Sequence, residues 1–531
     1  MKPRHAILGL IAAFGLAAAA LAHDAVEGKG QLGKVSFPTS CDPKVQADFD
    51  RAVAMLHSFW YSYGEKAFRE VLAKDPNCAI ATWGIASILM SNPLAGVGAS
   101  PKGAEQARLA IEQGRRIGAK TERERGYLEA VAVYYEDWAN RPERDRQAAR
   151  AKAYEALAAR YPDDDEAQIF AALYIAGTQT QADQTYAAYL KAAAVLEKQF
   201  VKHPDHPGVA HYLIHSYDAP PIAKQGLNAA RRYATIAPAA PHALHMPSHI
   251  FTRVGEWDES AATNLRSADV AKKGNEADEA YHAADYSVYA FLQLGRDAQA
   301  RRVMEEALAI TGIDQARFTA YYAIAAMPAR LAVERGAWSD AAQLQAGTSK
   351  FLFTNAITHF ARALGAARTG NPAAAEQEAE QLAAIHKALL AAKNNYWATE
   401  VEVQRLAVAG WIALARSKPD DALKFMRAAA DLEDKSEKHI VTPGRILPAR
   451  ELLGDMLLEL KQPAAALKEY ETSQAREPNR FRGYAGAAMA AEQSGQRQRA
   501  AEYYRKLLAL AKNADSARPE IAHAKTYVAQ Q

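Results

Sequence analysis

Two pairs of histidines stand near the middle of this 531-residue sequence, and both have the spacing i,i+4. On a helix, His211 with His215 and His245 with His249 would each place two imidazoles on one face. The second pair follows the first by 34 residues, which is the length of one repeat built from two helices. Stacked repeats align equivalent side chains, so we predict that the four histidines form one patch on adjacent helices.

The residue types of this patch predict a metal site. Neutral imidazole is a common ligand of transition metals, and seven of the 15 histidines lie between His203 and His249. An all-histidine or histidine-plus-carboxylate shell suits zinc, copper or iron, and the sequence does not choose among them. Three alternatives stay open: a polar seam packed between helices, direct contact with a ligand without metal, and a groove that responds to pH.

A proline complicates the second pair, because Pro247 lies between His245 and His249. If Pro247 opens a helix, His245 precedes that helix and the i,i+4 argument fails for this pair. If the proline is internal, the helix kinks at this point.

The elements that must position these residues are helical hairpins. Glycines predict the tight turns within four later hairpins: Gly255, Gly295, Gly336 and Gly495. This punctuation resembles that of tetratricopeptide-repeat (TPR) proteins over most of residues 45–510. The resemblance implies an all-α fold, a TPR-like solenoid of helical hairpins that curves into a superhelix.

In the TPR family the first helix of each repeat lines a concave groove. Repeat positions counted from Pro238 and Gly295 imply that the groove contains both histidine pairs and further polar residues: His242, Arg253, His282, Asp285, Tyr289 and Arg330. Of these, His282 and Asp285 are the predicted completing metal ligands, and Asp218 is a second nearby carboxylate. The two arginines would bind a carboxylate or phosphate, or else pair with acidic side chains. We interpret His57 as a core histidine rather than a groove residue.

The segments HYLIHSYD and PHALHMPSHIF resemble those of uncharacterised exported bacterial TPR proteins. That similarity supplies no function. Two hypotheses follow: a metal-binding protein, whose enzymatic version would activate water or dioxygen at the metal, and a scaffold that binds a peptide or protein partner in the groove without metal.

The first 22 residues read as a signal peptide. Lys2 and Arg4 precede an apolar run, and Ala20 and Ala22 form a small-residue cleavage site. We therefore expect cleavage after Ala22 and a periplasmic or secreted protein with no stable membrane span, an uncleaved anchor being the alternative. The formal net charge of +3 argues against a nucleic-acid partner.

The sequence contains two cysteines, Cys41 and Cys78. Export favours a disulfide, and an antiparallel hairpin would bring the residue before the first helix and the residue after the second to the same end. A thiol pair that binds metal is the alternative.

We expect the chain to divide as follows: signal peptide 1–22, flexible lead-in 23–44, irregular TPR-like helices 45–200, central repeats with the histidine-rich groove 201–345, TPR-like helices 346–436, and closing repeats with a tail 437–531.

Overall fold

The computed structural model describes residues 30–531, and this part of the chain consists of helices joined by turns and loops, without strands. The predicted all-α fold is therefore confirmed. The predicted signal peptide, its cleavage site and the start of the lead-in lie outside the described residues. Within 30–531, no helix combines the length and the apolar character that crossing a bilayer requires.

The first part of the array begins with a short 3₁₀ turn at Pro43–Val45. It continues with α2 (Gln46–His57), α3 (Tyr61–Lys74), α4 (Ile80–Leu89), α5 (Pro101–Ile117), α6 (Glu122–Tyr135), α7 (Glu143–Arg160), α8 (Asp165–Ala176) and α9 (Ala187–Lys202).

The middle part contains α10 (Pro207–Ser216), a 3₁₀ turn at Ala223–Gly226, α11 (Leu227–Ile236), α12 (Pro241–His245), α13 (Pro247–Val254), α14 (Trp257–Lys273), α15 (Ala277–Gln293), α16 (Asp297–Leu308), α17 (Thr319–Val333) and α18 (Trp338–Ala342).

The last part contains α19 (Leu352–Arg368), α20 (Pro372–Ala391), α21 (Asn395–Ala415), α22 (Pro419–Glu433), α23 (Ala449–Glu459), α24 (Pro463–Arg476), α25 (Phe481–Gln493), α26 (Arg497–Leu510) and α27 (Pro519–Ala529).

The four predicted turn glycines all join the two helices of a hairpin. Gly255, Gly295, Gly336 and Gly495 have φ angles of 74°, 67°, 65° and 75°. Such left-handed backbone suits glycine because no Cβ meets the following carbonyl. These turns confirm the hairpin boundaries that the sequence predicted.

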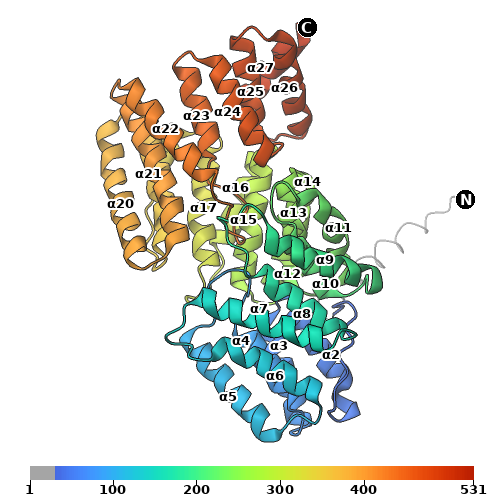
Figure 1. Ribbon diagram of the computed structural model, residues 1–531. Coiled ribbons are helices and arrows are strands. Elements are labelled where there is room, and N and C mark those ends of the chain that lie inside the picture. Colours follow the sequence, from blue (N-terminus) through green and yellow to red (C-terminus); the bar gives the residue numbers. More distant parts are fainter. Residues whose placement is uncertain (1–29) are drawn as a thin grey trace, which may run out of the picture.

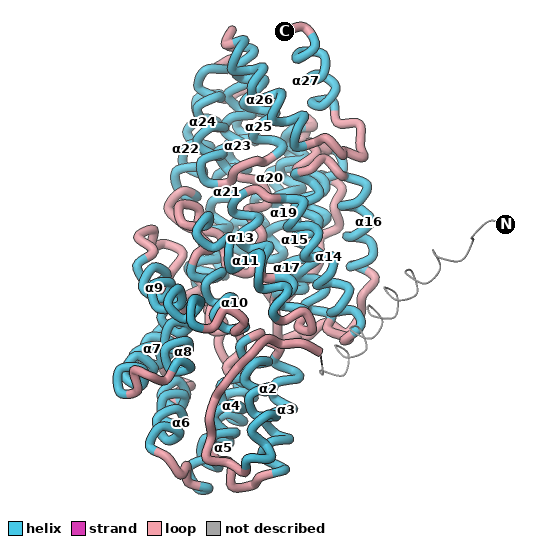
Figure 2. Tube along the Cα trace, turned by 90° about the vertical axis from the view of Figure 1, so that its right-hand side faces the viewer, coloured by secondary structure: helices cyan, strands magenta, loops and turns pink. Residues whose placement is uncertain are grey.

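Consecutive helices pack against one another along the whole array, as Figures 1 and 2 show, with α2–α8 at one end and α23–α27 at the other. Two contacts join helices far apart in sequence: α2 packs against α10, and α15 packs against α25. The solenoid therefore curves back on itself. This curvature brings the loop after α2 onto α10, the helix that carries the first histidine pair.

One long non-helical stretch, residues 434–448 between α22 and α23, lies inside the molecule; we call it the inner segment. The predicted boundary between residues 436 and 437 falls within this stretch, which is mostly buried. Its backbone and side chains bond to distant parts of the array: Glu437 to Gln181 and Arg253, Lys438 to Asp218, the Thr442 carbonyl to Tyr286, and the Gly444 carbonyl to Arg330.

The inner segment thus covers residues that the repeat count places in the groove, Arg253 and Arg330 among them. The expectation of an open groove at this point needs correction, because a part of the same chain occupies the surface. The physical reason is the pairing of buried polar groups: Arg253 and Asp218 form ion pairs with Glu437 and Lys438, and Arg330 donates to the Gly444 carbonyl.

Cys41 and Cys78 form a disulfide, and the two residues are 37 positions apart in the sequence. It joins the lead-in to the end of the first hairpin.

We expect the double variant Cys41→Ser/Cys78→Ser to lose about 3–4 kcal/mol of unfolding free energy, because the closed loop restricts the unfolded chain. Urea unfolding measures this loss. A reductant should lower the unfolding midpoint of the unaltered protein and leave that of the variant unchanged; equal responses would contradict the prediction.

His439 of the inner segment gives the fold a defined acid sensitivity. It packs among Phe318, Tyr396 and Trp397, and burial, followed by the charge of Lys438, lowers its pKa to about 3. The unfolded chain therefore binds a proton below about pH 6.5 that the folded chain does not, and stability falls as the pH drops from there toward 3.

We expect His439→Asn to reduce the loss of unfolding free energy between pH 7 and pH 5 by about 2 kcal/mol. Asparagine keeps the acceptor for the Val441 backbone amide, which now donates to His439 Nδ1. Urea unfolding at both pH values measures the difference. The same loss in both proteins would be inconsistent with the depressed pKa.

Candidate metal centre

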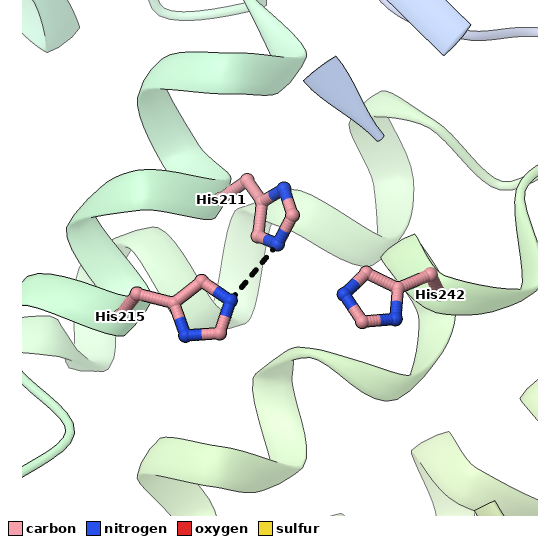
Figure 3. A group of neighbouring side chains, drawn as sticks. All are labelled: His211, His215 and His242. Carbon is pink, nitrogen blue, oxygen red and sulfur yellow. Dashed lines mark hydrogen bonds between the residues drawn. The ribbon is translucent and has the colours of Figure 1, made fainter. Parts of the chain in front are cut away.

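Three buried histidines form the first group, which we call trio 1: His211 and His215 from α10 and His242 from α12. Each offers one ring nitrogen, and these three atoms lie within 4.8 Å of one another. Figure 3 shows the three rings converging, with the Nε2 atoms of His211 and His215 at 3.1 Å. The i,i+4 spacing on α10 accounts for this pair.

Three more form trio 2: His245 from α12, His249 from α13 and His282 from α15, again with one nitrogen each within 4.8 Å. The Nε2 atoms of His245 and His249 are 3.0 Å apart. The proline between them does not separate the pair. Met246 keeps helical backbone angles, its amide donates to the His242 carbonyl, and Pro247 opens α13 directly afterwards.

The structure thus divides the predicted patch of four histidines into two groups of three. His242, expected only as a groove residue, joins trio 1, and His282, expected as a completing ligand, joins trio 2. Asp285 does not take part, because its carboxylate is paired with the buried guanidinium of Arg330. The prediction of Asp285 as a ligand therefore needs correction, because its negative charge is paired with the positive charge of Arg330.

The outward-facing nitrogens of several of these rings are held by acceptors. His211 Nδ1 donates to the His57 carbonyl at 2.7 Å, and His249 Nδ1 donates to Asp218 at 2.9 Å. His245 Nδ1 donates to Asn264 Oδ1 at 2.7 Å. The Asn264 amide is itself oriented, because its NH₂ group donates to the Ser260 carbonyl.

A proton on Nδ1 leaves Nε2 of a neutral imidazole with a bare lone pair. In trio 2, His245 and His249 therefore point two lone pairs at each other across 3.0 Å. That arrangement is repulsive, and a cation between the two nitrogens would relieve it; the Tyr286 hydroxyl also lies 3.4 Å from His249 Nε2. A tetrahedral ion at about 2.0–2.1 Å from each nitrogen would separate them by about 3.3 Å, close to the observed distance.

Burial keeps these imidazoles neutral. Desolvation lowers the pKa of His211, His215, His245 and His282 well below the ordinary value, and lowers that of His249 to about 4 despite its bond to Asp218. Neutral imidazole is the form that binds metal, so the groups are ready for metal at neutral pH. The same shift argues against a groove that changes charge near pH 6–7.

A third group, His57 and His206 with Glu166, differs from the trios because its ring nitrogens all have hydrogen-bond partners. His57 and His206 both donate from Nε2 to Glu166, each at 2.9 Å. The other nitrogen of His57 bonds to the Tyr212 hydroxyl, and that of His206 accepts from the Val209 amide as an N-cap. Every ring nitrogen is satisfied without a metal. We interpret this group as structural, in agreement with the core role predicted for His57.

The remaining predicted groove residues are held by ion pairs or hydrogen bonds. Asp218 is buried and bonds to Arg253 at 2.8 Å, to Lys438 at 3.3 Å and to His249. Although burial raises the pKa of Asp218, Lys438 and Arg253 together depress it far below the usual range. The Tyr289 hydroxyl accepts from Arg480. Of these, Asp218 alone bonds to a trio histidine.

Other residues at the site carry no signal in the sequence. Asn264 lies in α14 without a recognisable motif, and Glu279, 3.4 Å from His242 Nδ1, comes from α15. Phe59 follows α2, more than 150 positions before trio 1, and its ring lies 4.4 Å from that of His211 and 5.5 Å from that of His242. The φ angle of Phe59 is 51°, a strained value for a bulky residue that recurs at functional sites.

Comparison with known proteins assigns no family. No family model and no curated protein matches the sequence. Solved structures do match, and one of them, the APC/C hetero-tetramer of Cut9 and Hcn1, aligns over 92% of this chain and 95% of its own chain. The identity is 13% and the TM-score 0.29, so this similarity supports no statement about family or function.

The buried pairing of Asp218 makes a testable prediction. Removing its charge deprives the buried cations Arg253 and Lys438 of this carboxylate in an environment without water. We therefore expect Asp218→Asn to lower the unfolding free energy by about 3–5 kcal/mol. Urea unfolding of the metal-free protein measures it. The matched control is Asp258→Asn at the half-exposed pair with Arg296, where we expect a change within about 0.5 kcal/mol. Equal effects of the two substitutions would refute the prediction.

Proposed function

We propose that this protein binds a transition-metal ion through its buried histidines, with trio 2 as the minimal site. The observation that carries the proposal is the pair of facing Nε2 lone pairs on His245 and His249. Both Nδ1 atoms already donate to outer acceptors, so no proton is left to place between the rings in their neutral forms.

The surroundings support the same interpretation. Metal-ligating histidines almost always donate their second nitrogen to a carboxylate or carbonyl, which orients the ring. His211, His245 and His249 follow this pattern with a backbone carbonyl, an amide and a carboxylate. The donor set is imidazole alone, which favours zinc, copper or iron over magnesium or calcium.

A three-histidine shell leaves one coordination position open, as in catalytic zinc sites. Such an ion would supply a Lewis acid, or would lower the pKa of a bound water. The chain's own residues would orient the imidazoles, exclude bulk water and balance charge through Asp218 and Glu279. Metal-dependent chemistry on a substrate is the enzymatic form of the proposal, in an exported protein.

The alternative hypothesis, a scaffold for a peptide or protein partner, draws on the helical-hairpin fold. At the trios the structure does not favour it, because the inner segment already bonds to Asp218, Arg253 and Tyr286 there. A partner would have to use another face of the array.

The first test is elemental analysis of the full-length mature protein, purified without a histidine-containing tag. We expect at least one equivalent of a transition metal, as isolated or after reconstitution with zinc, copper or iron, and a higher unfolding midpoint when metal is bound. His245→Ala/His249→Ala should lose that metal while circular dichroism still reports a helical protein.

The matched control is His206→Asn, which changes a buried histidine of the third group. Asparagine retains the N-cap of α10 and His57 still pairs with Glu166, so we expect unchanged metal content. Absence of metal and of any metal-dependent stabilisation in the unaltered protein would overturn the proposal.

A further inference from the structure

The two trios are not separated by other side chains. Within trio 2, ring centroids lie between 4.1 Å, for His245 and His282, and 6.4 Å, for His249 and His282. In trio 1, the ring of His211 lies 4.9 Å from that of His215 and 5.1 Å from that of His242. Between the two trios, the ring of His215 lies 5.5 Å from that of His249, and the ring of His242 lies 5.8 Å from that of His245. The distances across the boundary thus fall within the range of the distances between neighbouring rings inside the trios. The six imidazoles form one continuous cluster.

Trio 1 also contains ring nitrogens whose lone pairs have no hydrogen-bond donor. His211 donates from Nδ1 to the His57 carbonyl, so its Nε2 carries a lone pair. His242 turns Nδ1 toward Glu279, and its buried Nε2 has no hydrogen-bond partner. Figure 3 shows the latter nitrogen facing His211 and His215. A buried ring nitrogen without a partner is rare in folded proteins and needs an explanation.

A proton does not explain trio 1 completely. His215 can carry its proton on Nε2 and donate to His211 across 3.1 Å, which satisfies that one contact. His215 Nδ1 and His242 Nε2 then both remain buried and without partners. An ion in trio 1 would take up the lone pairs of His211 and His242 at once.

We propose that the six histidines hold two metal ions, one on each trio, as a dinuclear centre whose ions share one small bridging ligand. This inference rests on the metal binding proposed above and goes beyond it in stoichiometry and in ligand class.

Charge favours an anion as the bridge. Imidazole ligands bring no negative charge to compensate two divalent ions, and the carboxylates that pair with the trios are Asp218, through His249, and Glu279, through His242. Asp218 already balances Arg253 and Lys438, and Glu279 also faces Arg317. An added anion such as hydroxide would supply the missing negative charge between the ions.

Aromatic rings restrict the size of that ligand. Phe59 lies over trio 1, 4.4 Å from His211. Tyr286 lies beside trio 2, with ring centroids 4.7 Å from His245 and 5.2 Å from His249. Its hydroxyl donates to the Thr442 carbonyl of the inner segment, which holds the ring in place. These walls fit a diatomic or monatomic bridge rather than a larger substrate.

The test is titration of the metal-free, full-length protein with copper(II), followed by exchange against a weak chelator that removes copper from exposed histidines. Total copper and the integrated electron paramagnetic resonance signal are then measured together. We expect two ions per chain and a signal well below two spins, because a shared bridge couples the ions. His211→Ala/His242→Ala and His245→Ala/His249→Ala should each retain one ion with the signal of one full spin.

The control His206→Asn should keep two coupled ions. One ion per unaltered chain would overturn the second site while leaving the proposed metal binding in place. Two ions with the full signal of two spins would overturn the shared bridge. No bound copper would overturn the dinuclear centre, and the reconstitution with zinc and iron described above then decides whether the proposed metal binding fails with it. A double variant that fails to fold is recognised by circular dichroism, and the measurement on the unaltered chain still decides.

Discussion

The carboxylate of Asp218 is the point at which distant parts of the chain meet. It accepts from His249 of trio 2, from Arg253 of α13 and from Lys438 of the inner segment, and it is almost completely buried. A buried carboxylate is costly unless each of its oxygens is paired, and here the partners come from α13 and from the inner segment. The orientation of His249 therefore depends on the docking of a segment nearly two hundred residues further along the chain.

The inner segment changes what a helical-hairpin array can do. In an open array the concave surface is available to partners, whereas in this chain residues 434–448 lie against it and bond to Tyr286 and Arg330. The result is an interior rather than a groove. Water is excluded from the imidazoles, their pKa values fall, and they stay in the neutral form that binds metal.

The contrast among the three histidine groups shows why the count of histidines alone does not identify a metal site. His57 and His206 share Glu166, and all four of their ring nitrogens have partners. In the two trios the outer nitrogens of His211, His245 and His249 are bonded, while inner nitrogens face one another. The groups differ in which ring nitrogens already have a hydrogen-bond partner. The positions of neighbouring carbonyls, amides and carboxylates determine this.

Periodicity and spacing determined a good part of this protein. The hairpin pattern, the turn glycines and the i,i+4 pairs depend only on residues that are close together in the sequence. Local backbone geometry is therefore sufficient to predict them. The pairing of Cys41 with Cys78 followed in the same way from one hairpin. What only the tertiary structure decided is the grouping of the histidines: His242 joined trio 1, and Asp285 was taken by Arg330.

The roles of Asn264, Phe59 and the inner segment also required the folded chain, because contacts between residues far apart in sequence depend on how the solenoid curves. That curvature is a sum of small packing rotations between many helices, and no single residue encodes it.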